Sequence, residues 1–533
     1  MLCASAVLML TAACGRSGTD AVDISVIGPE PAPAAMPATA PATAPATAPA
    51  TAPATAPATA NAPARAAQGA DLLDPAGFPA SAATRAGLVG FDAVGRLVPA
   101  LAERWIVTDD GLGYIFRLRD AQWSDGAPIT GPDVAAALRR ALAAAHGTPI
   151  GADLAAIRNV RVMARRVIEI DLDVAQPDLL TLLAQPELAI VAGPRGQHHA
   201  GPMDLRREGS HWQARLVPPD HPGLPLVPPP AVSRPLALRF QSAQAAVDRF
   251  AVGKADLVLG GTFDSLPLVT RIAMARGNLH FDPVAGLFGL DVLAARGFLA
   301  DAANREALAM AIDRDGLVAA FGVSGWQATT RMVSAGLDGD SGAVAERWTD
   351  RTLDQRRAAA TERVGAWISA RGKANAGANS SAGPSAPVLT LALPAGAGAD
   401  ILFQRLHDDF AAIGVTLLRA AKGQAADLAL IDSVARYPRA RWFLERLSCA
   451  SHRQVCSEAG DSALQAAMRS GDAAAAADLL AQAEGQITMA NGFIPLARPL
   501  RWSLVHGSVA GLVPNPWGWH ALPPLAGADS GNN

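Results

Sequence analysis

The stretch that decides the fold runs from residue 95 to residue 134 and reads GRLVPALAERWIVTDDGLGYIFRLRDAQWSDGAPITGPDV. Its segment 114–119 alternates apolar and polar residues, which predicts a half-buried strand. Residues 124–126 have the composition of a tight turn. Pro132 suits the first position of a helix that continues through the alanine-rich run to Ala145. We therefore expect a strand, a turn and a helix, with core positions at Tyr114, Phe116 and Trp123.

The same reasoning extends along the chain. Alternating apolar residues predict further strands at 167–174, 236–240, 388–393 and 427–431. Helical spacing predicts a helix at 304–321 and a helical pair at 462–489 that breaks at 470–472. A stretch rich in Gly, Ala, Asn and Ser at 372–387 predicts a surface insertion. The chain is therefore expected to be a mixed α/β protein.

Length and composition exclude several classes of protein. At roughly 100–200 residues per domain, a chain of 533 residues predicts two to four domains. The net charge of -3 argues against a nucleic-acid partner, which needs a basic face. No run of 18 or more consecutive apolar residues exists to span a bilayer, and alanine accounts for the positive mean hydropathy. Arginine greatly exceeds lysine, which we interpret mainly as a codon bias of the genome.

The amino terminus resembles a targeting signal. Residues 2–13 form a short apolar stretch that ends in small residues, which is typical of a signal peptide. The stretch closes as LTAACG at 10–15, which resembles the bacterial lipobox and predicts a lipid on Cys14. No Lys or Arg precedes the apolar stretch, which departs from the usual signal. A plain secreted signal and a coincidental apolar start are the alternatives.

A proline repeat follows. From residue 37 to residue 60 the chain repeats Pro-Ala-Thr-Ala with a period of four. Such a tract has no apolar surface to bury and cannot offset the entropy of ordering it. We expect a semi-extended linker that holds a folded protein away from the membrane, with a reach between roughly 40 Å and roughly 150 Å.

The other two cysteines form an even pair. Cys449 and Cys456 lie seven positions apart, and a disulfide between them suits an oxidising envelope. A metal site there is the weaker alternative, because only His452 lies nearby.

With these elements in place, the chain resembles a known family. The motifs GRLVPALAERW at 95–105, DDGL at 109–112, YIFRLR at 114–119, WSDGAPIT at 123–130 and DV at 133–134 look like the signature of family 5 extracellular solute-binding proteins. These proteins are the peptide, dipeptide and nickel receptors of ABC importers. Further similar segments follow in the family's order: GP at 201–202, RFAVGKADL at 249–257, NREAL at 304–308 with AIDR at 311–314, IPL at 494–496 and VAG at 509–511.

The resemblance implies a type II periplasmic-binding-protein fold, with two lobes, a hinge and the three domains of the peptide-receptor subclass. It implies a discontinuous first domain. The expected division is a signal peptide at 1–13, a lipid-anchored linker at 14–64, domain I at 65–98, 197–288 and 500–533, domain II at 99–196 and domain III at 289–499.

The ligand positions depart from the family. Peptide receptors carry a Trp-x-x-Asp-Tyr segment in the cleft, whose Asp pairs with the peptide amine. The corresponding segment here runs from Ser433 to Tyr437, with Ser in place of Trp and Arg436 in place of Asp. Ala86 stands where a cleft-facing Glu often precedes Gly-Leu, and Arg498 adds positive charge after the Ile-Pro-Leu motif.

An arginine cannot accept a hydrogen bond from an ammonium group, so a free peptide amine is not expected to be selected at Arg436. We hypothesise a carboxylate-bearing or other anionic solute, with Arg436 as a fork-shaped donor and Tyr437, Ser433, Ala86 and Arg498 as further ligand-binding residues. The alternative is that Arg436 faces solvent or pairs with a nearby acid.

Other chemistry finds little support in the sequence. His198, His199 and His211 are read as surface histidines, and we expect no metal and no cofactor. No catalytic motif such as Gly-x-Ser-x-Gly or His-Glu-x-x-His occurs, so an enzyme is not expected.

The resemblance implies a monomeric, lipid-anchored periplasmic receptor that passes a small solute or peptide to an ABC permease and its ATPase. The alternative is an envelope binding or signalling protein that kept the fold and lost transport.

Overall fold

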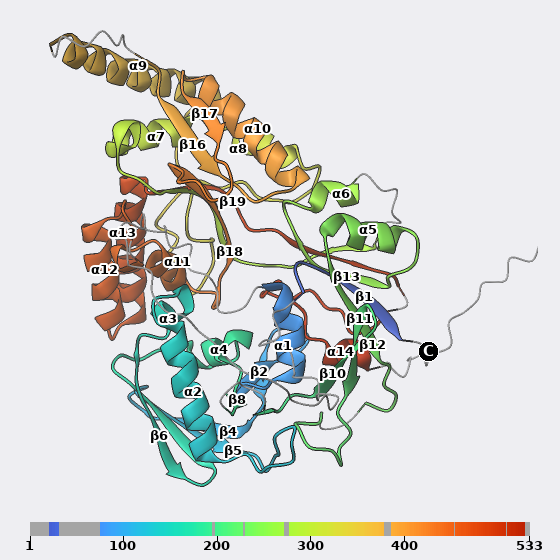
Figure 1. Cartoon of the computed structure of the whole chain (residues 1–533). Helices are drawn as coiled ribbons and strands as arrows, with labels where there is room; N and C mark the ends of the chain where they lie inside the picture. Colours follow the sequence, from blue (N-terminus) through green and yellow to red (C-terminus); the bar gives the residue numbers. More distant parts are fainter. Residues whose placement is uncertain are drawn as a thin grey trace, which may run out of the picture.

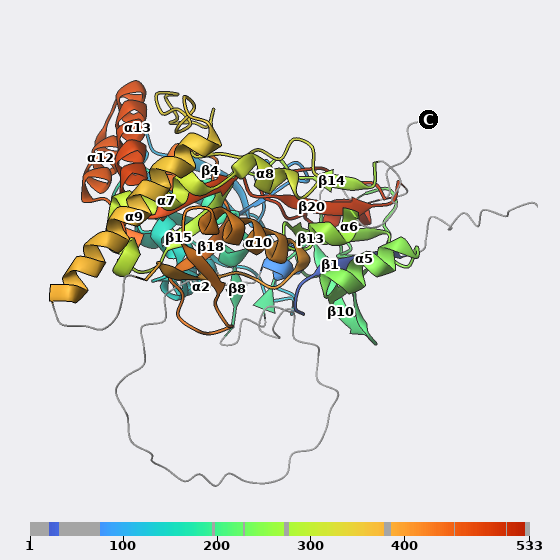
Figure 2. The same ribbon diagram turned by 90° about the horizontal axis from the view of Figure 1, so that it is seen from above.

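The computed structural model describes residues 21–30, 75–193, 198–226, 230–270, 277–377, 385–451, 453–507 and 509–527. Three large sheets organise these residues, with seven, five and four strands. The five-stranded sheet and its helices occupy one side of the molecule, and the other two sheets occupy the other side (Figure 1). From above, α9, α12 and α13 lie at one end and β1, α5 and β10 at the other (Figure 2).

The seven-stranded sheet contains the most amino-terminal of the described strands. Its order is β10-β11-β12-β1-β13-β20-β14. Strand β1 is parallel to β12 and β13 on its two sides, and the remaining pairs are antiparallel. The strands are β1 (Val22–Ile27), β10 (Met203–Glu208), β11 (His211–Leu216), β12 (Leu236–Gln241), β13 (Leu257–Thr262), β14 (Leu279–Phe281) and β20 (Arg501–Val505), and the helices beside them are α1 (Phe78–Thr84), α5 (Ala243–Ala251), α6 (Leu266–Thr270) and α14 (Pro523–Ala526).

Strand β1 corrects the predicted linker. The interval 14–64 was expected to be linker throughout, but residues 22–27 form a strand inside the sheet. Val22, Ile24 and Val26 are each at most 2% exposed, so this strand contributes to the core. The Pro-Ala-Thr-Ala repeat lies outside the described residues, as do the signal peptide and Cys14. In chain order the repeat joins β1 to the 3-10 helix η2 (Pro75–Gly77), and it does not precede the fold.

The four-stranded sheet is antiparallel throughout, with the order β4-β5-β7-β6. The predicted strand, turn and helix between residues 114 and 145 are all present. Gly126 has a φ of 85°, as the turn requires, and Tyr114, Phe116 and Trp123 are each at most 3% exposed. The elements are β4 (Ala102–Val107), β5 (Gly113–Leu118), β6 (Ile157–Ala164), β7 (Val167–Leu172), α2 (Gly131–Ala145), α3 (Pro149–Asp153), α4 (Leu179–Leu183) and η3 (Pro186–Leu188), with the small pairs β2 (Val89–Phe91) and β3 (Leu97–Pro99), and β8 (Val191–Ala192) and β9 (His198–His199).

The five-stranded sheet has the order β17-β16-β18-β15-β19. Strands β17, β16 and β18 are parallel, and β15 is antiparallel to both of its neighbours, β18 and β19. Its elements are β15 (Gly286–Val292), β16 (Val388–Ala392), β17 (Thr416–Arg419), β18 (Leu428–Val434), β19 (Phe493–Ala497), η4 (Gly297–Ala300), α7 (Ala302–Ala311), α8 (Arg314–Ala319), α9 (Leu353–Gly377), α10 (Ala397–Ala411), α11 (Ala440–Arg446), η5 (Cys449–Ser451), α12 (Glu458–Arg469) and α13 (Ala473–Ala490).

Two helix predictions were wrong in part. The single helix expected at 304–321 is two helices, because Ile312 has an extended backbone and the Asp313 carboxylate caps α8 by accepting from Gly316 N at 3.0 Å. Helix α9 continues to residue 377 and so enters the expected surface insertion, of which residues 378–384 lie outside the described residues. The predicted break at 470–472 is confirmed, and Asp472 caps α13.

The central place of β1 makes a testable prediction. Ile24→Ala should lower the free energy of unfolding by about 2–5 kcal/mol, because Ile24 is fully buried and its loss leaves a cavity. Urea unfolding of the chain measures the change. Ile106→Ala is a matched control, because Ile106 also lies in a strand but is 64% exposed. Equal effects of the two substitutions would show that β1 is not part of the core.

Candidate functional site

Two short crossings connect the two sides of the molecule. Residues 282–285 lead from β14 to β15, and residues 498–500 lead from β19 to β20. An ion pair joins the two sheets beside these crossings. Arg501 Nη1, at the start of β20, is 2.8 Å and 3.0 Å from the two carboxylate oxygens of Asp432 in β18. Both side chains are about 15% exposed or less. Burial raises the pKa of Asp432, and Arg501 opposes that effect.

A cavity of about 350 Å³ lies at the five-stranded sheet, beside these crossings. The cavity is lined by the first residues of β15, helix α8, the segment 326–335 and strand β19. Its apolar wall includes Trp326 and Phe493, and its charged lining residues are Asp315, Arg331, Glu346 and Arg498. The cavity is large enough for a small ligand.

Two of these charges are compensated within the protein. Arg331 forms ion pairs with Asp340 and Glu484, each at 2.9 Å, and its side chain is only 7% exposed. Burial acts to raise the pKa of Glu346, but hydrogen bonds from Thr329 and Thr330 lower it overall. Glu346 therefore holds the loop at 329–330 in place as an ionised carboxylate.

Arg498 is different. Its backbone is fixed on both sides, because its N–H donates to Gln327 O at 3.1 Å and its carbonyl accepts from Trp326 Nε1 at 2.8 Å. Its half-buried side chain lines the cavity, and within the described part of the chain it has no ion pair. The exposed carboxylate of Asp315 also lines the cavity and has no ion pair among the described residues. A guanidinium in this setting suits the recognition of a carboxylate.

The other predicted ligand residues do not line this cavity. Ser433 is half-buried in β18, opposite Leu287 of β15. Tyr437 is fully buried, and its hydroxyl donates to Glu445 at 2.6 Å. Ala86 is 6% exposed in the core. Of the five predicted residues, only Arg498 meets the cavity.

The structure gives Arg436 a different setting from the one hypothesised. Its guanidinium lies 3.2 Å from Glu187 and 3.7 Å from Asp153, and its side chain is 9% exposed. Gln185 donates to its backbone carbonyl at 3.2 Å. Arg436 follows the five-stranded sheet, whereas the two acids belong to η3 and α3 beside the four-stranded sheet. The alternative of pairing with a nearby acid therefore holds, and Arg436 joins the two sides of the molecule.

Further arginines make the same connection. Arg439 bonds Asp178 at 2.8 Å, and Arg441 donates to the side-chain oxygen of Gln176 at 3.1 Å. Beneath these polar contacts, one buried apolar cluster contains both Leu182 of α4 and Trp442 of α11. The two sides of the molecule are thus in contact through charge pairs and through a shared core.

The buried acid beside Arg436 predicts a pH dependence. Burial raises the pKa of Asp153 to about 7, although Arg436 acts to lower it. Between pH 4 and pH 7 the unfolded chain releases this proton while the folded chain retains it, so rising pH reduces stability. The resulting loss in the free energy of unfolding is up to about 4 kcal/mol, and it is complete above pH 7. Asp153→Asn should remove it.

Urea unfolding at pH 5 and pH 8 tests this prediction. The stability of Asp153→Asn relative to the parent chain should increase between the two pH values. Asp120→Asn is the control, because Asp120 has a 93% exposed side chain and should give no such change. A difference that does not depend on pH would contradict the prediction.

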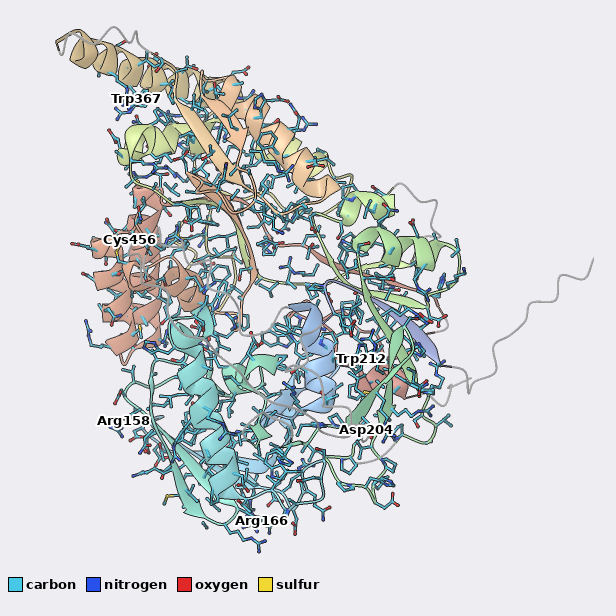
Figure 3. The ribbon with its side chains drawn as sticks, viewed as in Figure 1. Arg158, Arg166, Asp204, Trp212, Trp367 and Cys456 are labelled. Carbon is cyan, nitrogen blue, oxygen red and sulfur yellow. A yellow bond between two sulfur atoms is a disulfide. The ribbon has the colours of Figure 1, made fainter. Side chains whose placement is uncertain are left out.

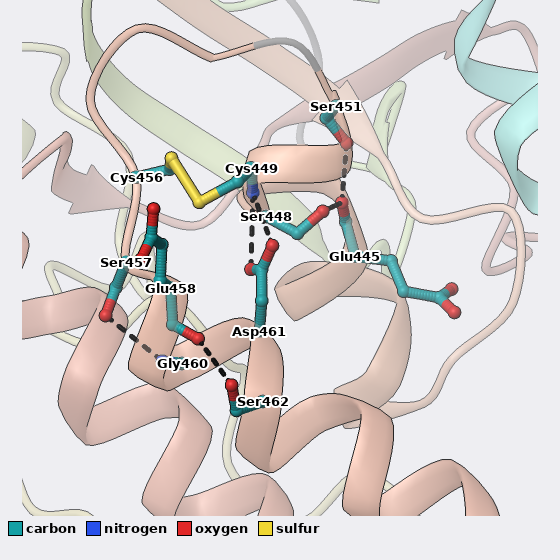
Figure 4. Close-up of a disulfide and its surroundings, with 10 residues drawn as sticks. All are labelled: Glu445, Ser448, Cys449, Ser451, Cys456, Ser457, Glu458, Gly460, Asp461 and Ser462. Carbon is teal, nitrogen blue, oxygen red and sulfur yellow. Dashed lines mark hydrogen bonds between the residues drawn. A yellow bond between two sulfur atoms is a disulfide. The ribbon is translucent and has the colours of Figure 1, made fainter.

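The disulfide lies apart from the cavity. Cys449 and Cys456 are joined, with their Cα atoms 5.1 Å apart, as the sequence predicted. Cys449 N donates to both carboxylate oxygens of Asp461 in α12, at 3.0 Å and 3.2 Å (Figure 4). Ser457 caps the same helix by accepting from Gly460 N at 3.1 Å. The disulfide therefore fixes the connection between α11 and the start of α12.

Removing this disulfide should cost about 2 kcal/mol of stability, because it closes a short loop in the unfolded chain. The double variant C449S/C456S should unfold at a lower urea concentration than the parent chain in oxidising buffer. Dithiothreitol should lower the stability of the parent chain to the same level and leave the variant unchanged. A parent chain that is insensitive to dithiothreitol would disprove the prediction.

The histidines occupy separate environments. His198 lies 2.8 Å from Asp125. His199 was predicted to lie at the surface, but it is buried, and desolvation lowers its pKa. His211 pairs with Glu208 across the β10–β11 ladder. Across the described residues, no group of three or more His, Cys, Asp or Glu side chains could hold a metal ion. None of the helices in these described residues combines the length and the apolarity that a membrane crossing needs.

Sequence reasoning missed most of the cavity. Asp315, Trp326, Glu346 and Phe493 come from four separate segments, and no local pattern marks them as neighbours. The available signal was the Ile-Pro-Leu motif, which led to Arg498 because the crossing follows it directly.

The arrangement of the three sheets, with its two crossings, matches the type II periplasmic-binding-protein fold that the sequence predicted. The architecture is similar to that of OppA from Burkholderia pseudomallei (TM-score 0.72, 17% identity, covering 95% of this chain and 99% of that chain). It is equally similar to the murein tripeptide binding protein MppA from Escherichia coli (TM-score 0.72, 17% identity, covering 96% and 98%). At this level of identity the comparison shows the fold.

Residues 96–213 match the model described as bacterial extracellular solute-binding proteins, family 5 Middle. The chain is 35% identical over 144 residues to the probable deoxycholate-binding periplasmic protein YgiS from Escherichia coli K12, which covers 24% of this chain and 25% of that protein. It is 44% identical over 64 residues to the periplasmic oligopeptide-binding protein OppA from Haemophilus influenzae, 12% of each chain. The sequence matches thus span a quarter or less of these relatives. The expected resemblance is confirmed for residues 96–213, which match the family 5 model, and across the rest of the chain the comparisons show the fold.

Proposed function

We propose that this chain is the solute-binding component of an ABC-type importer. It captures a small solute between its two lobes and delivers it to an inner-membrane permease and its ATPase. The fold, the two crossings at 282–285 and 498–500 and the adjoining cavity support this proposal. A ligand that contacts both lobes favours the closed arrangement, because it binds that state more tightly. The relatives are binding proteins, which favours a receptor over an enzyme.

The observation that carries the ligand proposal is the setting of Arg498. This residue lines the cavity from the second crossing, and no described carboxylate pairs with it. Its guanidinium would bind a carboxylate of the solute through charge-assisted hydrogen bonds. Asp315 offers an acceptor for a cationic or hydroxyl group elsewhere on the same solute. Peptide-like solutes and other carboxylates both fit this arrangement.

The location is part of the same proposal. Cys14 would carry the lipid, after cleavage of the signal at residue 13, and the protein would function as a monomer in the periplasm. The discontinuous domain I and the domains at 99–196 and 289–499 remain our proposed division of the folded chain. The signal peptide and Cys14 are supported by sequence pattern alone.

Calorimetry with a defined panel tests the ligand proposal. The panel should contain a tripeptide, its carboxy-terminal amide, deoxycholate and methyl deoxycholate, because two relatives are named for a tripeptide and for deoxycholate. We expect each carboxylate to bind more tightly than its neutral partner. Mass spectrometry of material that copurifies with the chain extends the panel. Equal affinity for acids and neutral partners would contradict the role of Arg498.

Arg498→Gln should weaken carboxylate binding by about 10- to 100-fold, the value of a hydrogen bond to a charged group. It should also remove the preference for acids over neutral partners. Arg158→Gln is the matched control, because Arg158 is an exposed arginine at the four-stranded end of the molecule (Figure 3). Binding without uptake in cells would favour the alternative of an envelope binding or signalling protein.

A further inference from the structure

The position of β1 determines how far the protein can lie from its anchor. Val22 begins this strand, and its N–H donates to Pro235 O at 3.0 Å. Asp23 exchanges two hydrogen bonds with Asp256, at 2.8 Å and 2.9 Å, and its carboxylate lies 2.9 Å from Arg249 Nη2. The first residues of β1 are therefore held on both sides.

Only residues 15–21 separate Val22 from Cys14. Fully extended, these residues reach roughly 25 Å. The Pro-Ala-Thr-Ala repeat adds nothing to this length, because it follows β1 in the chain. Glu30, just past the other end of β1, accepts from Trp212 Nε1 at 2.9 Å and pairs with Arg207. Glu30 is thus held against the sheet. A change in chain length within residues 37–60 comes after this contact, so it does not alter the distance between Cys14 and β1.

The edge that surrounds the start of β1 has a suitable surface. The segments that lead into β12 and β13 flank it, since Pro235 lies beside Val22 and Asp256 beside Asp23. Val232 and Val252 on these segments are 50% and 67% exposed, and Lys254 is exposed beside Val252. Exposed apolar side chains with a lysine suit the interface of an anionic bilayer.

The hinge lies at the opposite end of the same sheet. Strand β20 runs antiparallel to β13, so Val505 pairs with Leu257 near the start of β1, and Arg501 pairs with Thr262 at the far end. The crossing at 498–500 and the cavity continue from Arg501. The five-stranded sheet is thus attached at the end that points away from the start of β1 (Figure 1).

We propose that the edge formed by the starts of β12, β1 and β13 faces the lipid surface, held there by the short spacer from Cys14. The five-stranded lobe then moves on the side away from the membrane. The inference rests on the proposed lipid anchor and is independent of which solute binds.

Energy transfer on vesicles tests it. The full lipidated chain is inserted into vesicles of phosphatidylethanolamine and phosphatidylglycerol that contain a headgroup-labelled acceptor lipid. A donor dye is placed by Lys254→Cys or by Leu418→Cys, whose site in β17 is 48% exposed on the other lobe. We expect strong loss of donor fluorescence at position 254 and little at position 418.

Two variants that change the length of the chain test whether residues 15–21 are the spacer that holds β1 near the membrane. Insertion of 30 Gly/Ser residues between Gly18 and Thr19 should abolish the loss at position 254, because such a chain reaches roughly 30 Å further on average. Deletion of 37–60 should leave the loss unchanged. Equal transfer at the two dye positions, or a response to the deletion and none to the insertion, would overturn the inference.

Mass spectrometry of Cys14 separates this inference from the solute proposal. A chain without lipid on Cys14 would overturn both the anchor and this orientation, while calorimetry with the solute panel would still decide whether the cavity binds carboxylates. A lipidated chain with transfer at position 254 would support the orientation even if no solute in the panel binds.

Discussion

The architecture depends on one constraint: the chain passes between its lobes only at two short crossings in the described residues. The Asp432–Arg501 ion pair lies across them and is largely buried. Removing one partner of such a pair leaves an uncompensated charge, so these two residues restrict how the crossings can deform. The cavity and Arg498 lie beside them, which places the candidate ligand contact at the point about which the lobes would turn.

The arginines of this chain have two distinct roles. Arg436, Arg439 and Arg441 meet acids or amides on the opposite lobe, where each contact depends on both sides being together. Arg498 is compensated by no carboxylate of the described chain and faces the cavity. A protein that closes around a solute needs both kinds of contact, because the lobe contacts set the balance between open and closed states and the ligand shifts that balance.

The sequence predicted what depends on local pattern. The alternation at 114–119, the turn at Gly126 and the helix after Thr130 follow from neighbouring residues, and all three are present. Strand β1 was missed because only six residues, between a signal peptide and a repeat, carry its pattern. The charge reversal at Arg436 was visible, but its partners Asp153 and Glu187 come from another part of the chain. Contacts between distant segments are fixed by the tertiary fold, which a local pattern cannot reveal.

The place of β1 also bears on how the protein is made. Strand β1 is among the first segments synthesised, yet its neighbours β12 and β13 begin at Leu236 and Leu257. Strand β20, which pairs with β13, ends at Val505. Pairings between such distant segments form late, because the entropy cost of closing a long loop precedes the favourable contacts that offset it. The seven-stranded sheet cannot be completed until nearly the whole chain is available. A nascent chain therefore lacks the complete sheet until β20 has been synthesised, and the export that we propose would act on a chain without it.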